Sequence, residues 1–213
     1  MGKKTIEGLY LLADTSVLQG EALLQAVAAA LTAGAKVVQY RDKSSDAQKR
    51  RGEAMALRAL CAAHDACFLV NDDAPLALDV GADGVHIGRD DGGMARARAA
   101  LGADRIVGVS CYNQPELARR AQSQGADYVA FGAFFPSDIK PHAVRADIAL
   151  LRDPSLNVPV VAIGGINAEN AAPLIANGAS AIAVISAVLK ADDPGRAARE
   201  LVQLFEYRLE QHP

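Results

Sequence analysis

The chain has 213 residues, of which 51% are apolar, and its 22 basic and 25 acidic side chains give a formal net charge of -3. A chain of this length and composition favours one α/β domain with a sizeable core. The charge balance offers no basic stripe for nucleic acid, so any anionic ligand must be held by a local cluster.

Short β-branched runs recur along the chain, each nearly continuous in apolar character, as is typical of strands covered on both faces. We predict strands over residues 8–14, 36–40, 67–71, 83–88, 105–110, 127–132, 158–165 and 181–186. Alanine-rich segments of helical period lie between most of them, over residues 21–33, 46–64, 93–101, 114–124, 168–177 and 194–211. This alternation predicts a single-domain (β/α)₈ TIM barrel over residues 1–213, with a doubly wound open sheet as the alternative.

The beginning of the chain, MGKKTIEGLYLLAD, carries two lysines but lacks the apolar run and the cleavage site of an export signal. No apolar stretch reaches membrane-spanning length. The three cysteines, Cys61, Cys67 and Cys111, form no C-x-x-C pair, so we expect reduced thiols. We therefore expect a cytoplasmic protein without membrane or nucleic-acid partners, and a homo-oligomer remains possible.

Charged residues follow several of the predicted strands, at the end of the barrel where such folds carry their active sites. The cations are Arg41, Lys43 and Lys140, and the carboxylates are Asp72 and Asp91. Cations alone would bind a phosphate and carboxylates alone a hard cation, whereas together they fit a magnesium–diphosphate. Any one of them could be a solvated loop charge, but five at one predicted rim favour a binding site.

A second anion site is predicted on the last two strands. The glycine pair Gly164–Gly165 ends strand seven, where backbone N–H groups could approach a phosphate, and Ile185 and Ser186 end strand eight. Close packing could equally require the glycines. Two anion sites facing each other imply two phosphorylated substrates and hence a transferase.

Seven segments in order resemble the thiamine-phosphate synthase family. They are QYRDKS (39–44), VNDD (70–73), GADGVHIGRDD (81–91), GVSCYN (108–113), GADYVAFGAFFPSDIK (125–140), VPVVAIGGIN (158–167) and VISAV (184–188). The resemblance implies a magnesium-dependent fusion of hydroxymethylpyrimidine diphosphate with hydroxyethylthiazole phosphate, which gives thiamine phosphate and pyrophosphate by a dissociative mechanism.

The resemblance also implies a role for individual residues. Asp72 and Asp91 would bind Mg²⁺. The diphosphate would be held by Arg41, Lys43, Asn71 and Lys140. Gln39 and Ser110 would lie beside the pyrimidine, with Ser110 near the reacting centre. Ser137 would contact the thiazole phosphate, and the backbone of Gly165, Ile185 and Ser186 would complete that site. The residues expected to act in catalysis are Ser110, Lys140, Arg41 and Lys43.

Three positions depart from the family pattern. Arg89 replaces a usual glutamine, Ile139 replaces a threonine that precedes the lysine, and Asp138 adds a carboxylate to an anion-binding loop. We expect His86 to be a structural residue of the barrel lining and Cys111 not to be a nucleophile, because no histidine is paired with it in the sequence pattern.

Two other functions remain open. A thiazole tautomerase-like isomerase would share the barrel, but it would have no use for a metal–diphosphate clamp. A non-catalytic phosphate-binding barrel would have lost its chemistry at Ile139. Magnesium dependence distinguishes them, because only the synthase needs both substrates and the metal to release pyrophosphate.

Overall fold

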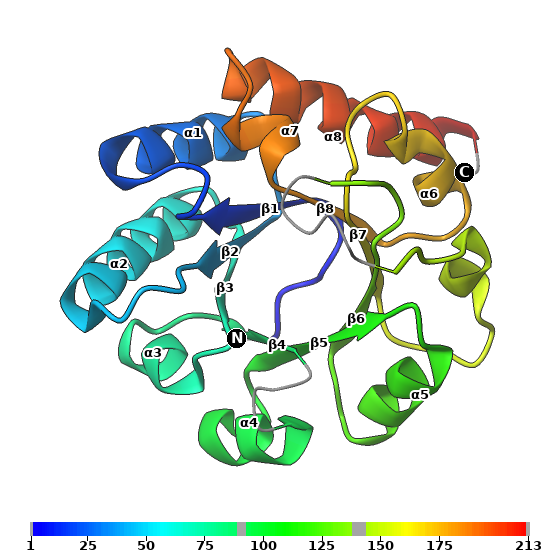
Figure 1. Ribbon diagram of the computed structural model, residues 1–213, viewed down its shortest axis with the longest axis horizontal. Coiled ribbons are helices and arrows are strands. Elements are labelled where there is room, and N and C mark those ends of the chain that lie inside the picture. The colour runs from blue at the N-terminus through cyan, green and yellow to red at the C-terminus, as the bar shows by residue number, and fades with distance from the viewer. Residues whose placement is uncertain (1, 89–92, 138–143, 212–213) are drawn as a thin grey trace.

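The computed structural model describes residues 2–88, 93–137 and 144–211, without the side chains of 208–211. Eight parallel strands close into a barrel in sequence order (Figure 1). They are β1 (Gly8–Asp14), β2 (Val37–Arg41), β3 (Cys67–Asn71), β4 (Gly84–Ile87), β5 (Ile106–Tyr112), β6 (Tyr128–Phe131), β7 (Val160–Ile163) and β8 (Ala181–Val184). The predicted (β/α)₈ barrel is therefore confirmed, and the open sheet is wrong because β8 pairs with β1.

Helices cover the outside of the barrel (Figure 1). The longer ones are α1 (Gly20–Thr32), α2 (Ala47–Ala63), α4 (Gly93–Leu101), α5 (Pro115–Ser123) and α8 (Pro194–Gln211), all close to the predicted segments. The short ones are α3 (Ala74–Asp79), the 3₁₀ helix η1 (Ile148–Arg152), α6 (Ala171–Ala176) and α7 (Ser186–Leu189). The sequence predicted α6 but missed α3, η1 and α7, which are too short to display a helical period.

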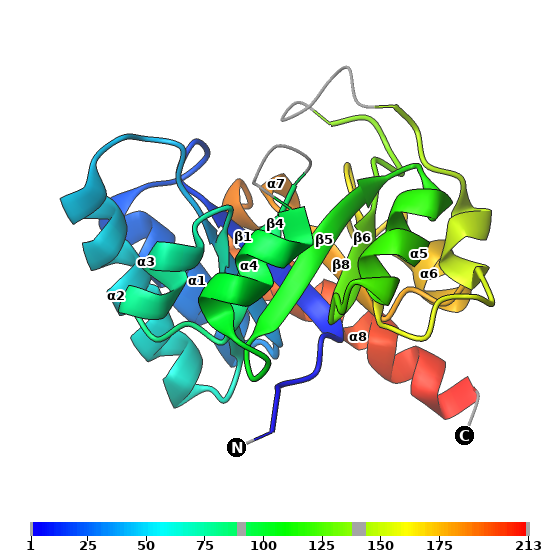
Figure 2. The same cartoon turned by 90° about the horizontal axis from the view of Figure 1, so that it is seen from below.

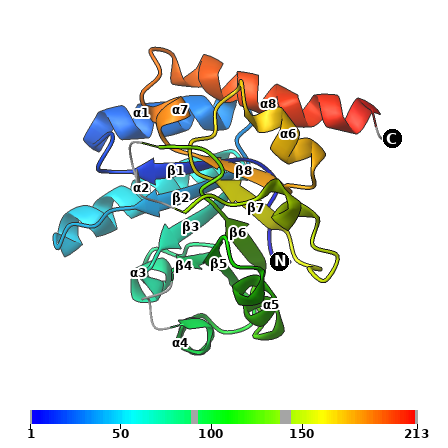
Figure 3. The ribbon, with the colours of Figure 1, turned by 45° about the vertical axis from the view of Figure 1, so that its right-hand side comes forward.

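The strands separate two apolar clusters, because successive side chains point to opposite faces of a strand. In β1, Leu9 and Leu11 face the helices, whereas Tyr10 and Leu12 point into the barrel. The inner cluster also contains Leu69, Tyr128 and Val161, among others. Figure 3 shows the strands of the barrel obliquely. The space that they enclose is thus a packed core that contains two tyrosines.

The two ends of the barrel differ. Figure 2 shows the chain entering β1 from the lower side, where Ile6 is buried against the inner cluster. The segments that follow β2 and β6 lie on the opposite side, at the C-terminal ends of the strands. Within the described residues, no helix is both long and apolar enough to cross a membrane.

Candidate active site

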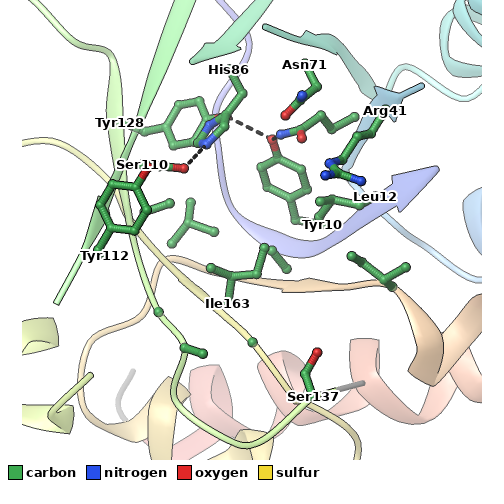
Figure 4. Close-up of a pocket in the computed structure, with 18 of the residues that line it drawn as sticks. Tyr10, Leu12, Arg41, Asn71, His86, Ser110, Tyr112, Tyr128, Ser137 and Ile163 are labelled. Atoms are coloured by element: carbon green, nitrogen blue, oxygen red, sulfur yellow. Dashed lines mark hydrogen bonds between the residues drawn. The ribbon is translucent and has the colours of Figure 1, made fainter. Parts of the chain in front are cut away.

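A cavity of about 460 Å³ opens at the C-terminal ends of the strands (Figure 4). Its lining comes from every part of the barrel, and it includes five residues predicted from the sequence for a substrate site: Gln39, Arg41, Asn71, Ser110 and Ser137. Ile185, expected at the second phosphate, also lines it. Residues far apart in sequence therefore meet in one cavity.

The base of the cavity is aromatic. The rings of Tyr10 and Tyr128 meet edge to face with centroids 6.2 Å apart, and His86 stacks on Tyr128 at 5.5 Å. Burial raises the pKa of both tyrosine hydroxyls above their ordinary value, so both carry their proton at neutral pH. The base thus offers flat apolar faces and neutral polar groups to a planar ligand.

A continuous chain of hydrogen bonds crosses this base, partly visible in Figure 4. Gln39 Nε2 donates to the Tyr10 hydroxyl at 2.5 Å, and that hydroxyl lies 2.8 Å from the Tyr128 hydroxyl. Nδ1 of His86 lies 2.8 Å from the Tyr128 hydroxyl, and its Nε2 lies 2.8 Å from Ser110 Oγ. His86 thus lines both the barrel and the cavity, and it is hydrogen-bonded to a predicted site residue.

Arg41 is anchored by a buried carboxylate. Its Nη1 donates to Asp14 Oδ2 at 2.6 Å, and the Asp14 side chain is only 1% exposed. Asp14 also accepts from the backbone N–H and the hydroxyl of Ser16. A guanidinium held from behind in this way is preorganised to face an anion in the cavity.

Asp42 lies between the predicted cations Arg41, the last residue of β2, and Lys43, and its side chain is hydrogen-bonded on several sides. Its carboxylate accepts from Thr15 Oγ1 at 2.9 Å, from Lys49 Nζ at 2.8 Å and from the backbone N–H of Ser44 at 2.6 Å. Burial alone would raise the pKa of Asp42, but these bonds outweigh it and hold the pKa well below its ordinary value. The Asp42 carboxylate is therefore a buried, ionised anchor.

Lys43 and Asp72 form an ion pair at the rim, and Asn71 Nδ2 donates to Asp72 Oδ2 at 2.5 Å. Neither Lys43 nor Asp72 lines the cavity itself. A carboxylate beside an amide fits one side of a Mg²⁺ site, since this ion takes few protein carboxylates together with water and phosphate oxygens. The described residues contain no group of three or more His, Cys, Asp or Glu side chains that could hold a metal.

The glycine pair lies against the segment that follows β6. A Cβ on Gly164 would come within 2.5 Å of the Ala133 Cβ, and one on Gly165, whose φ is +65°, within 2.2 Å of the Pro136 carbonyl oxygen. Gly164 lines the cavity but Gly165 does not. Close packing thus explains why both positions are glycine, whereas the anion role of the Gly165 backbone stays a prediction. Ser186 begins α7 and does not line the cavity either.

Two predicted site residues, Asp91 and Lys140, lie outside the described residues, as do Arg89, Asp138 and Ile139.

The sequence interpretation missed Tyr10 and Tyr128 as lining residues. Their signal was weak, because one tyrosine in an apolar strand reads as ordinary core. Cys111 is buried, and burial raises the pKa of its thiol to about 12, which agrees with the expectation that it is not a nucleophile.

The family model described as thiamine monophosphate synthase matches residues 9–188. The chain belongs to this family. It is therefore an enzyme of the transferase class associated with thiamine biosynthesis, as the sequence predicted.

Individual relatives agree over nearly the whole chain. The thiamine-phosphate synthase of Chromobacterium violaceum is 52% identical over 95% of this chain and 98% of its own length. That of Thiobacillus denitrificans is 55% identical over 87% of this chain and 89% of its own. The thiamine phosphate pyrophosphorylase structure from Pyrococcus furiosus superposes with a TM-score of 0.86 at 36% identity, covering 95% and 96% of the two chains.

Proposed function

We propose that this member of the family is a thiamine-phosphate synthase, which condenses 4-amino-2-methyl-5-hydroxymethylpyrimidine diphosphate with hydroxyethylthiazole phosphate. The observation that carries the proposal is the division of the cavity. Its base, built from Tyr10, Tyr128 and His86, suits flat aromatic rings, and Arg41 at the side suits a phosphorylated tail. Both substrates have this two-part chemistry.

In the proposed reaction the pyrimidine methylene–oxygen bond breaks first, and pyrophosphate leaves with the bonding electrons. The thiazole nitrogen then donates its lone pair to the methylene carbon and becomes a thiazolium. No proton is transferred in forming this bond, so the site needs no general base. Arg41, held by Asp14, and Lys43 would stabilise the charge that develops on the departing diphosphate.

We propose Mg²⁺ as the cofactor, with Asp72 and Asp91 as its ligands. When bound, the ion would neutralise diphosphate oxygens. Lys43 now pairs with Asp72, so metal binding would free this cation to turn toward the diphosphate.

An assay of pyrophosphate release tests the proposal. The purified chain should release pyrophosphate only when both substrates and Mg²⁺ are present, and the product should have the mass of thiamine phosphate. Turnover of the thiazole substrate alone without metal would support the isomerase instead. Binding of either substrate without any turnover would support a phosphate-binding barrel.

We also propose a cytoplasmic location. The three cysteines are free and buried, as expected in a reducing compartment.

A further inference from the structure

The chain of hydrogen bonds beneath the cavity could run in either of two directions. Each hydroxyl has one proton and can accept two hydrogen bonds, so a buried hydroxyl with two neighbours keeps its proton hydrogen-bonded only if it donates to one of them. Gln39, Tyr10, Tyr128 and His86 are each at most 8% exposed, and a buried polar group without a partner is costly. The direction at one end therefore fixes every bond up to the other end.

We propose that the Gln39 carboxamide sets this direction, so that His86 carries its proton on Nε2 and Ser110 offers its hydroxyl proton to the ligand. Gln39 Nε2 can only donate, so Tyr10 must donate to Tyr128. Tyr128 must then donate to Nδ1 of His86, which leaves the ring proton on Nε2, facing Ser110 Oγ. Tyr10, Tyr128 and His86 act as positioning residues in this arrangement.

This direction deepens the proposed function, because it assigns the chemistry of Ser110. The Ser110 oxygen already accepts from Nε2, so its proton is available to an acceptor atom such as a ring nitrogen of the substrate. His86 has no lone pair left on Nε2, so it cannot remove the Ser110 proton. Ser110 and His86 are spaced like the nucleophile and base of a hydrolase, but here His86 only orients Ser110, whose hydroxyl acts as a fixed hydrogen-bond donor.

The ring nitrogens of His86 can be observed directly by NMR of protein labelled with ¹⁵N-histidine, without substrate. The His86→Gln variant identifies its signals among those of the four histidines. In the wild type we expect Nε2 to carry the proton, with the other neutral form about tenfold or more less populated. A proton on Nδ1 in the wild type would overturn the proposal, even if no variant folds.

The Gln39→Glu variant should reverse the donor–acceptor direction of every hydrogen bond between residue 39 and Ser110. A carboxylate accepts from Tyr10, so every following bond turns round and Nδ1 of His86 gains a proton. The added charge could also act on His86 through space, and two variants separate this effect from transmission through the hydrogen bonds. Asn71→Asp places the same charge at the same cavity but outside the series of hydrogen bonds. Gln39→Glu combined with Tyr10→Phe interrupts that series.

Asn71→Asp and the double variant should both keep the His86 proton on Nε2. An unchanged tautomer in Gln39→Glu alone, or a proton on Nδ1 in either of the other two variants, would overturn transmission along the chain. Because the measurement needs no substrate, its failure is distinct from failure of the proposed synthase activity, which the pyrophosphate assay decides.

Discussion

Asp14 is the buried partner of Arg41, and we expect its substitution to weaken the site without removing any residue that lines the cavity. In Asp14→Asn the guanidinium loses its charged anchor, so kcat/KM for the diphosphate substrate should fall by about 10- to 100-fold. The KM for the thiazole phosphate should change little. Steady-state kinetics with each substrate varied in turn measures both.

The control for Asp14→Asn is Asp153→Asn. Asp153 pairs with Arg119 on α5, away from the cavity, so its loss should leave both kinetic constants unchanged. Equal losses for the two substrates in Asp14→Asn would mean that Asp14 supports the fold rather than Arg41.

Asp72 directly follows β3, and of the two proposed metal ligands it is the one that lies within the described residues. Asp72→Asn should lower turnover by more than about 100-fold at low Mg²⁺, with partial recovery as Mg²⁺ is raised. Asp79→Asn, which breaks the exposed ion pair with Arg51, is the matched control and should be silent. A magnesium titration of pyrophosphate release compares the two variants. Unchanged magnesium dependence in Asp72→Asn would remove Asp72 from the metal site.

Residues at strand ends were predictable because the fold places the ends of all eight strands at one rim. Charged side chains there, such as Arg41 and Asp72, contrast with the apolar strands that precede them. Tyr10 and His86 were harder to interpret, because their role depends on a hydrogen-bond chain between strands that are distant in sequence. No pattern within one strand contains that information.

Among the elements, the segment after β6 and the end of β7 are locked together by the glycine pair. Gly165→Ala should disturb this contact, because the new Cβ would meet the Pro136 carbonyl oxygen in addition to straining the backbone. We expect a loss of about 2 to 4 kcal/mol in the free energy of unfolding. The KM for the thiazole phosphate should rise, since Ser137 follows this contact directly.

Gly81→Ala separates backbone strain from the clash. Gly81 has φ of +66°, almost that of Gly165, but a Cβ there meets nothing within 4 Å. Its substitution should cost only about 1 kcal/mol and leave the KM unchanged. Urea unfolding and steady-state kinetics give both quantities. If the two variants lose the same stability, the packing of Gly165 against Pro136 is unimportant.

Several of the predicted elements match the structure to the residue. The expected segments 8–14, 93–101 and 194–211 coincide with β1, α4 and α8. The missed α3 has six residues and contains Pro75, and it is held by an Asp73 side chain that accepts from the Leu76 N–H. Such a helix depends on one cap and its tertiary contacts rather than on a periodic apolar face.

For the molecule as a whole, β1 and β2 are joined not only by backbone pairing but by buried carboxylates at their C-terminal ends. Asp14 belongs to β1 and holds Arg41 of β2, and Asp42, just after β2, accepts from Thr15, just after β1. The same groups therefore join two strands of the barrel and fix the residues at their C-terminal ends, where we propose the active site. Protonation of Asp42 at low pH should therefore weaken this link between the strands.

Asp42 allows this link to be tested. Hydrogen bonds hold its pKa below the ordinary value, so the unfolded chain binds the proton more tightly than the folded one. The stabilisation is therefore complete above the ordinary pKa of about 4 and is lost as pH falls below it. Asp42→Asn should unfold about 2 to 3 kcal/mol more easily at pH 7, and the difference from wild type should shrink at lower pH. Urea unfolding across this pH range measures the difference, and a constant gap between the two proteins would show that the Asp42 charge does not link the strands.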